Sequence, residues 1–208
     1  MKSLCIVIII ILSFNIAAAQ SSSRQFIYWE NLSAEQQSVI LNSKKFPSSF
    51  ITFYNSPEEV GTLDDNEVLS ILDSIVSNIN PVLQPFYYNL FRKMCEVADG
   101  YIGEVMGECS INLLFADPEY IINHVRKNGL ANKDSAEFNC IVRYISFEYQ
   151  SELNQDFKDR PSWPRFTSQL KTKMVNASEE NKKALDELLN RIKHDAEELI
   201  KDDEEDHN

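Results

Sequence analysis

The chain has 208 residues, of which 32 are acidic and 20 are basic, and its formal net charge is −12 at pH 7. An acidic surface repels phosphate backbones and anionic lipid headgroups, which disfavours nucleic-acid binding and electrostatic docking on membranes. A chain of this length fits one domain or two small ones, and it can bury a core without metal ions or dense disulfides.

The first 19 residues have the pattern of a secretory signal peptide. Lys2 gives a positive start, the run from Leu4 to Leu12 is apolar, and Ala17–Ala19 supply small residues for cleavage. The run is too short for a convincing membrane span, although an uncleaved anchor is the alternative, and no later segment has the apolar length of a spanning helix. We therefore expect a secreted, extracellular protein with no transmembrane segment after removal of residues 1–19.

The remainder of the chain has the periodicity of helices. Residues 20–27 are polar and Ser-rich and are expected to form a disordered lead-in. Across residues 28–201 apolar residues recur at three- and four-residue steps, which predicts a single helical domain. We expect an all-α fold, an irregular bundle of about seven to nine helices without a sheet. Helices are predicted at 33–43, 56–61, 65–80, 84–98, 100–114, 118–128, 134–153, 166–174 and 178–200.

One segment is ambiguous. Phe46–Tyr54 is rich in β-branched and aromatic residues, as a strand would be. A strand needs a partner, and no second segment of this kind follows, so we expect a loop or a short helix here.

The stretch from Asn80 to Leu114 contains much of the apolar surface of the chain. One helical face is formed by Leu83, Tyr87, Leu90, Met94 and Val97. The second half carries small residues at the same spacing, Gly100, Gly103, Gly107 and Ser110. Each glycine lowers helix stability by about 1 kcal/mol relative to alanine, so something must compensate. We interpret the small residues as a groove for close helix packing rather than as a functional cleft.

Two segments near the end of the chain bear on domain organisation. Arg160–Pro164 is the one stiff connector, and it marks a candidate subdomain boundary near 158–164. Residues 202–208 form an acidic tail, which we expect to be solvated and frayed.

The cysteines predict one bridge and one unpaired thiol. Cys5 leaves with the signal peptide, and an oxidising compartment favours pairing among the other three, Cys95, Cys109 and Cys140. If 81–98 and 100–114 are antiparallel helices, Cys95 lies opposite residue 104, which is unfavourable for a bridge to Cys109. We therefore favour Cys140 as one partner, and the leftover thiol could link two chains into a homodimer.

The polar residues offer few candidates for chemistry. Asn31 and Asn176 stand in glycosylation sequons, although both also lie near expected helix starts. His124 sits among apolar residues and is expected to be structural, while His194, with Glu197 and Glu198 at helical reach, is expected on a solvated face rather than at a metal site. We expect no cofactor and no enzymatic activity, because no catalytic motif is present; a catalytic interpretation would require His124 to fold against a cysteine.

The ring content suggests a second kind of function. The chain has 12 Phe, 8 Tyr and 2 Trp, and helices rich in rings can enclose a lipid-sized cavity, although a fully packed core is the alternative. The candidate ligand-binding rings are Phe86, Tyr87 and Phe91. Arg92 and Arg143 are the candidate partners of a fatty-acid carboxylate, or else surface residues with extended stems.

Three segments carry a family resemblance: Tyr28–Gln37, the run from Ile79 to Lys93, and Ser178–Ile192. They resemble parts of the nematode fatty-acid- and retinol-binding proteins, which implies a small, secreted, all-helical lipid carrier. The secreted nematode proteins of the SXP/RAL-2 type are similar in general character. Three cysteines, the glycine-rich helix and the Trp163–Pro164 connector depart from the first pattern, and the resemblance assigns no binding residue.

Two functions follow as hypotheses. The first is a secreted helical protein that binds a hydrophobic small molecule such as a fatty acid. The alternative is a secreted protein–protein interaction protein that has no ligand cavity.

Overall fold

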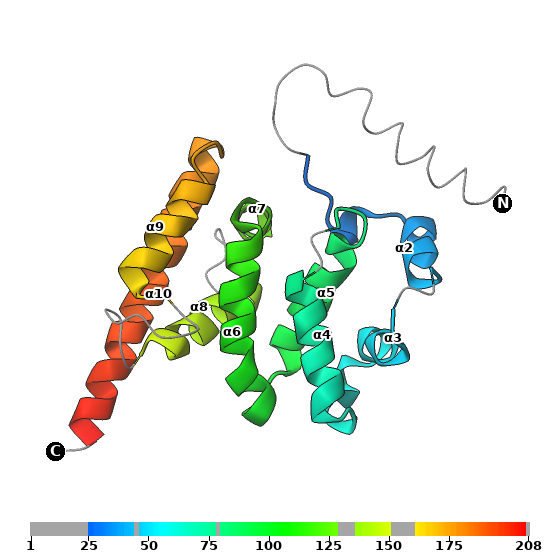
Figure 1. Cartoon of the computed structure of the whole chain (residues 1–208), viewed down its shortest axis with the longest axis horizontal. Helices are drawn as coiled ribbons and strands as arrows, with labels where there is room; N and C mark the ends of the chain where they lie inside the picture. Colours follow the sequence, from blue (N-terminus) through cyan, green and yellow to red (C-terminus); the bar gives the residue numbers. More distant parts are fainter. Residues whose placement is uncertain (1–24, 44–45, 78–79, 129–135, 151–160, 207–208) are drawn as a thin grey trace.

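The computed structural model describes residues 25–43, 46–77, 80–128, 136–150 and 161–206, and within them every regular element is helical (Figure 1). These residues form nine α-helices and two 3₁₀ turns, which confirms the predicted all-α fold. The elements are η1 (Trp29–Asn31), α2 (Ala34–Leu41), α3 (Ser48–Asn55), η2 (Pro57–Thr62), α4 (Asp65–Ser77), α5 (Gln84–Val97), α6 (Gly100–Ala116), α7 (Pro118–Asn128), α8 (Ala136–Tyr149), α9 (Trp163–Lys173) and α10 (Glu179–Asp206).

The helices are arranged around α8. It packs against α6 on one side and α10 on the other, while α4 packs against both α5 and α6. At one end of the molecule α9 and α10 lie side by side, joined by an ion pair between Lys171 and Asp186 at 2.8 Å (Figure 1). At the other end lie α2 and α3, so the N-terminal helices are far from the C-terminal pair.

Local sequence explains where several helices begin. Ser33 and Gln36 form the predicted capping box of α2, since the Gln36 N–H donates to the Ser33 hydroxyl and the Ser33 N–H donates to the Gln36 side chain. Pro85 occupies the first turn of α5, where a missing N–H is tolerated, and α5 begins at Gln84 as predicted. Gly100 has a φ of +43°, which allows the sharp turn from α5 into α6.

The ambiguous segment is a helix. α3 spans Ser48–Asn55, and its rings Phe50 and Phe53 are each only 1% exposed. The helical alternative is therefore confirmed. Burial of the two rings in the core stabilises this short helix, whereas a strand would have no partner strand to pair with. The next predicted helix is the 3₁₀ turn η2, which continues through Gly61 instead of ending there.

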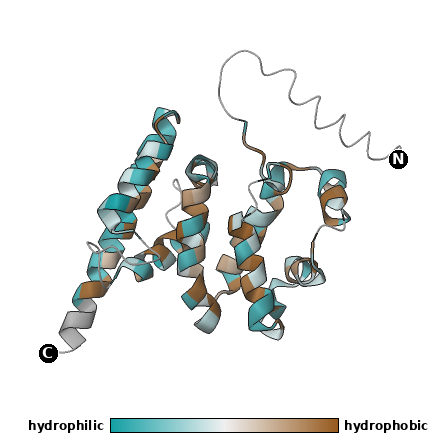
Figure 2. Cartoon of the chain, viewed as in Figure 1, coloured by the Kyte–Doolittle hydropathy of each residue, from teal (hydrophilic) through white to brown (hydrophobic). Residues whose placement is uncertain are grey.

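The core is continuous and rich in rings. Of the predicted stripe on α5, Leu83, Tyr87, Leu90 and Met94 are buried, and Val97 is partly buried. Figure 2 shows hydrophobic residues in brown along α5, α6 and α8, while α9 and α10 are mostly hydrophilic and teal.

Close helix packing is confirmed at two of the small residues of α6. A Cβ on Gly103 would meet the Tyr144 ring of α8 at 3.6 Å, and a Cβ on Gly107 would collide with the side chain of Glu148. Ser110 is also buried, whereas Gly100 faces open space and serves the turn. The groove therefore accommodates α8, which supports the packing interpretation.

The structure describes part of the expected connector and of the acidic tail. Trp163 packs on Tyr149 with ring centroids 5.0 Å apart, and the Tyr149 hydroxyl donates to the carbonyl of Pro161, so the described part of the connector is fixed to α8. α10 continues to Asp206, so residues 202–206 extend this helix, and the solvated, frayed character of the acidic tail stays a prediction.

Several predictions lie outside the described residues. They are the signal peptide at 1–19, most of the lead-in at 20–27, parts of the predicted helices at 65–80 and 134–153, the boundary at 158–160 and the tail residues 207–208. Among the described helices, none combines the length and the apolar character that crossing a bilayer requires.

Candidate functional site

A disulfide joins α5 to α8. Cys95 and Cys140 are bridged with Cα atoms 5.7 Å apart, which agrees with the prediction that Cys140 is one partner. The third cysteine, Cys109 of α6, is a free thiol that is 5% exposed. Burial, together with the charges of Asp73 and Glu108, raises its pKa to about 12. The buried position of Cys109 argues against an intermolecular bridge, and the predicted disulfide-linked homodimer stays a prediction.

The chemically richest site is a buried charged cluster around His124. We define the His124 cluster as Glu30, Tyr88, Arg92, His124 and Glu137. The His124 ring is fully buried and lies between two carboxylates, with Nδ1 2.9 Å from Glu137 Oε1 and Nε2 2.5 Å from Glu30 Oε1. The Tyr88 hydroxyl donates to Glu137, and the Arg92 guanidinium lies 3.4 Å from Glu137 and 3.6 Å from Glu30.

Four separate elements bring this cluster together. Glu30 belongs to η1, His124 to α7 and Glu137 to the first turn of α8, while Tyr88 and Arg92 stand one turn apart on α5. Residues four apart on a helix share a face, so α5 presents a hydroxyl and a guanidinium together. The cluster therefore connects the N-terminal segment with the three central helices α5, α7 and α8.

The carboxylates favour the charged form of His124. Burial of the ring acts to lower its pKa, but the hydrogen bonds to Glu137 and Glu30, and their negative charges, outweigh burial and raise the pKa above 6.5. Partial burial acts to raise the pKa of Glu30, but the hydrogen bond from His124 outweighs it and holds that pKa below 4.5. With His124 protonated, two cations balance two carboxylates.

The cluster reaches solvent on one side. Glu137 is 7% exposed, whereas Glu30 is 41% and Arg92 32% exposed at the side chain. Arg92 is thus engaged by two carboxylates of the protein, and a fatty-acid carboxylate would have to displace them. The arrangement has the character of a satisfied structural network, in which removal of one partner would leave a buried charge.

A second set of hydrogen bonds lies beside the cluster and involves Tyr28. Its hydroxyl accepts from the Asn123 amide at 2.6 Å and lies 3.3 Å from the Tyr120 carbonyl, to which it donates. The Tyr120 hydroxyl in turn donates to the carbonyl of Ile27 at 2.9 Å. Burial raises the pKa of Tyr28 to about 12, so these bonds do not change near neutral pH.

The predicted ligand-binding rings pack on one another. Phe86 lies 4.3 Å from the Phe46 ring and 5.8 Å from the Tyr87 ring, and Phe91 lies 6.0 Å from Tyr88, measured between centroids. Phe86 and Phe91 are fully buried. These rings therefore contact neighbouring rings in the core.

Arg143 is placed differently from Arg92. It is exposed on α8, and its guanidinium lies over the rings of Tyr144 and Phe147 at 5.6 and 5.8 Å. Such contacts are typical of a surface arginine whose stem covers apolar neighbours, which was the alternative interpretation. Among the contacts of the described residues, none joins Arg92 to Arg143.

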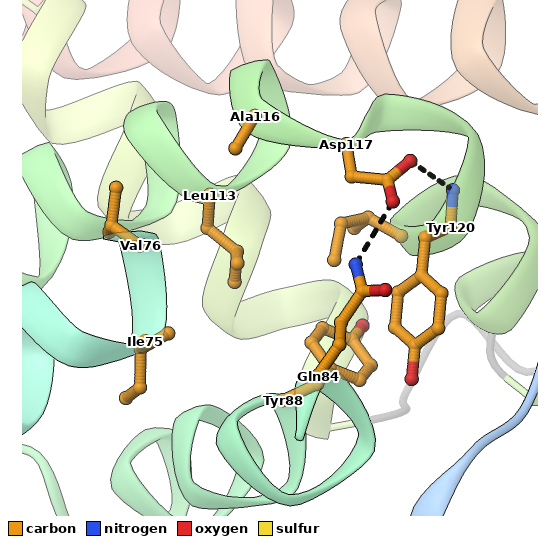
Figure 3. A pocket seen from close by; sticks show the side chains of 9 residues that line it. Ile75, Val76, Gln84, Tyr88, Leu113, Ala116, Asp117 and Tyr120 are labelled. Carbon is orange, nitrogen blue, oxygen red and sulfur yellow. Dashed lines mark hydrogen bonds between the residues drawn. The ribbon is translucent and has the colours of Figure 1, made fainter. Parts of the chain in front are cut away.

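A small hollow lies among α4, α5, α6 and α7 (Figure 3). Its free volume is about 10 Å³, which is room for one water molecule. Asp117 closes one side, accepting from the Gln84 amide at 2.9 Å and from the Tyr120 backbone N–H at 3.3 Å. The lining residues are Ile75, Val76, Gln84, Tyr88, Leu113, Ala116, Asp117, Tyr120 and Ile121.

The remaining candidates are on the surface. His194, Asp195 and Glu198 come close enough for a metal ion on α10, but both His194 and Glu198 are exposed and Arg191 already pairs with Asp195. Asn31 and Asn176 are both exposed, so the sequons are sterically open.

His124 was predicted to be structural, and its two carboxylate partners were not predicted. Glu30 lies 94 residues away, just before the predicted helix at 33–43, and Glu137 lies 13 residues away, in the first turn of the predicted helix at 134–153. Acidic residues are common at helix starts because they complement the helix dipole, so no local signal distinguished them.

Comparisons with known proteins find no relative of this chain. No protein-family model, no curated protein and no solved structure matches the chain. The resemblance to the two nematode families therefore stays a hypothesis based on sequence segments alone.

Proposed function

We propose that this protein acts through its outer surface, as a secreted interaction protein, rather than by enclosing a hydrophobic small molecule. The observation that carries the proposal is that the rings nominated for a ligand, Phe86, Tyr87 and Phe91, pack on other rings. A bound lipid needs a cavity of several hundred Å³. The hollow among α4, α5, α6 and α7 has about 10 Å³, and a second hollow of about 370 Å³ is open to solvent and is lined mostly by polar residues of α4.

The disulfide supports the extracellular part of the proposal. Bridges such as Cys95–Cys140 form and persist in oxidising compartments and are rare in the cytosol. The apolar run before residue 20 is the sequence feature that would direct the chain there.

The charge distribution indicates the class of partner. α10 contains twelve acidic and five basic residues, a net charge of −7, and its C-terminal turns extend past the other described helices in Figure 1. Its buried face is apolar, with Leu185, Leu188 and Ile192 in the core, and among its described side chains Glu187, Glu197 and Glu198 are exposed. A partner with a basic surface would be attracted to this helix.

Lipid binding is tested directly. Delipidated protein is titrated with a fluorescent fatty acid, with a known fatty-acid carrier assayed in parallel, and the protein is analysed by native mass spectrometry after purification. We expect no saturable fluorescence change and no co-purified lipid. Stoichiometric binding at micromolar probe would overturn the proposal in favour of the carrier hypothesis.

The role of α10 is tested with charge-matched variants. A triple variant of exposed α10 residues, E187Q/E197Q/E198Q, is compared with E35Q/E58Q/E59Q, which removes the same charge from exposed positions elsewhere. The probe is an arginine-rich peptide, and binding is measured at several salt concentrations. We expect the α10 variant to weaken binding more than its control. Equal weakening would show that only net charge matters.

A further inference from the structure

The segment before α2 has several contacts with the rest of the molecule, and one of these contacts depends on pH. We call residues 25–32 the strap. Most of its attachments are hydrogen bonds of neutral groups, such as Tyr28 with Asn123 and the Trp29 indole N–H with the Tyr54 hydroxyl at 3.3 Å. Glu30 is different, because its carboxylate contacts the titratable ring of His124.

The protonation state of His124 decides whether Glu30 and Glu137 can both accept a hydrogen bond from its ring. A protonated imidazole carries an N–H on each nitrogen and can donate to Glu30 and Glu137 at once. A neutral imidazole has one N–H, so its other nitrogen presents a lone pair to a carboxylate oxygen. One of the two contacts must then become repulsive.

Glu30 is the carboxylate that would leave. Glu137 is 7% exposed and is also held by the Tyr88 hydroxyl, whereas Arg92 lies near both carboxylates, 3.4 Å from Glu137 and 3.6 Å from Glu30. Glu30 is 41% exposed and can turn into water, where its charge is solvated at little cost. We propose that the strap is a pH-dependent attachment, which is fixed to the molecule while His124 is protonated and is loosened when that proton is lost.

The charged groups around His124 support this assignment. Among the described residues, the strap contributes Glu30 and Tyr28, α5 contributes Arg92 and Tyr88, and α8 contributes Glu137. On α7 itself Tyr120 is close to Tyr28, and Arg126 is paired with Asn181 of α10. With His124 neutral, the cluster changes from balanced charge to one excess negative charge, which favours departure of Glu30.

The pH window follows from the direction of the two pKa shifts. The pKa of His124 is raised in the folded protein, so its contribution is full below pH 6.5 and is lost as pH rises through the raised value. The pKa of Glu30 is lowered, so its contribution is full above pH 4.5 and is lost as pH falls through the lowered value. The strap is therefore held best between pH 4.5 and 6.5.

Loosening would uncover a ring-lined surface. Trp29 covers Phe86 and Tyr54, with ring centroids 5.4 and 5.7 Å away, and Tyr28 covers Tyr120 at 4.8 Å. These rings belong to α3, α5 and α7, and the strap covers one side of them. The device would thus present an apolar surface at pH values above the raised pKa of His124 and withdraw it below that pKa.

The experiment follows the exposure of Trp29. In a Trp163→Phe background Trp29 is the only tryptophan, and its quenching by acrylamide is measured from pH 5 to pH 9. We expect the quenching constant to rise at least about twofold with pH, because local opening exposes the indole. Its midpoint should coincide with the titration of the His124 ring measured by NMR.

A matched pair of variants separates the strap from general effects. In Glu30→Gln the amide can accept from a protonated ring or donate to a neutral one, so quenching should stay low and flat with pH. Glu35→Gln changes an exposed acid on α2 and should keep the rise of the parent. The proposal is overturned if quenching in the parent is independent of pH, if its midpoint differs from that of His124, or if Glu30→Gln keeps the rise. Circular dichroism at each pH confirms that the helices remain formed.

Discussion

At the scale of single residues, two glycines of α6 have the same predicted role in helix packing but different surroundings in the structure. Gly103 and Gly107 stand four apart and face α8, yet their surroundings differ. The Tyr144 ring leaves ordinary van der Waals room at Gly103, while Glu148 fills the space at Gly107. Sequence spacing predicted the groove, and only the position of α8 distinguishes the two residues.

Alanine substitutions at these two positions should have opposite effects. Gly103→Ala gains helix propensity without a clash and should raise the free energy of unfolding by roughly 0.5–1 kcal/mol. Gly107→Ala must displace Glu148 and should lower it by about 1–3 kcal/mol. Urea unfolding measures both values.

A double variant checks the cause. If the clash with Glu148 is the reason, Gly107→Ala should no longer be destabilising in a Glu148→Ala background. Finding Gly107→Ala as stable as Gly103→Ala in the parent chain would contradict the packing at this position.

At the scale of elements, α5 and α8 are connected twice. The disulfide joins Cys95 to Cys140, and one turn away on each helix Arg92 pairs with Glu137. The helices themselves followed from periodicity, and the offset argument pointed to Cys140. The ion pair did not follow, because nothing in either helix alone indicates which faces meet.

The disulfide should contribute strongly to stability. Closing a loop of 45 residues restricts the unfolded chain and is worth about 4 kcal/mol in the chain-entropy estimate. Urea unfolding with and without reductant should differ by a value of this order. Replacement of Cys109 by alanine is the control and should leave the effect of reductant unchanged. Peptide mapping that placed Cys109 in the bridge would contradict the pairing.

At the scale of the whole molecule, acidic charge and ring-rich packing are separated. Rings and aliphatic side chains from nearly every described helix meet in one core, while the charge lies mainly outside and is concentrated on α10. The exception is the His124 cluster, in which the charged groups of His124 and Glu137 are buried. Burial of so continuous a core implies that inner groups become accessible only when the molecule opens.

The thiol of Cys109 tests this cooperativity. It is buried and its pKa is raised to about 12, so the reactive thiolate is scarce as well as hidden. A thiol reagent should label no cysteine in the native mature chain and one after unfolding in urea. Non-reducing electrophoresis should show a monomer. Rapid native labelling, or a dimer band that disappears with reductant, would show that Cys109 reaches the surface.

Local periodicity, capping residues and cysteine spacing were enough to predict the helices, the helical core and a bridge that includes Cys140. Leu83, Leu90 and Met94 could be assigned to a buried face without coordinates. The folded arrangement was needed to see that rings pack on rings, that Arg92 is already paired and that His124 lies between two carboxylates. Those relations join residues up to 94 positions apart, and such contacts are set by how helix faces dock and not by any pattern along the chain.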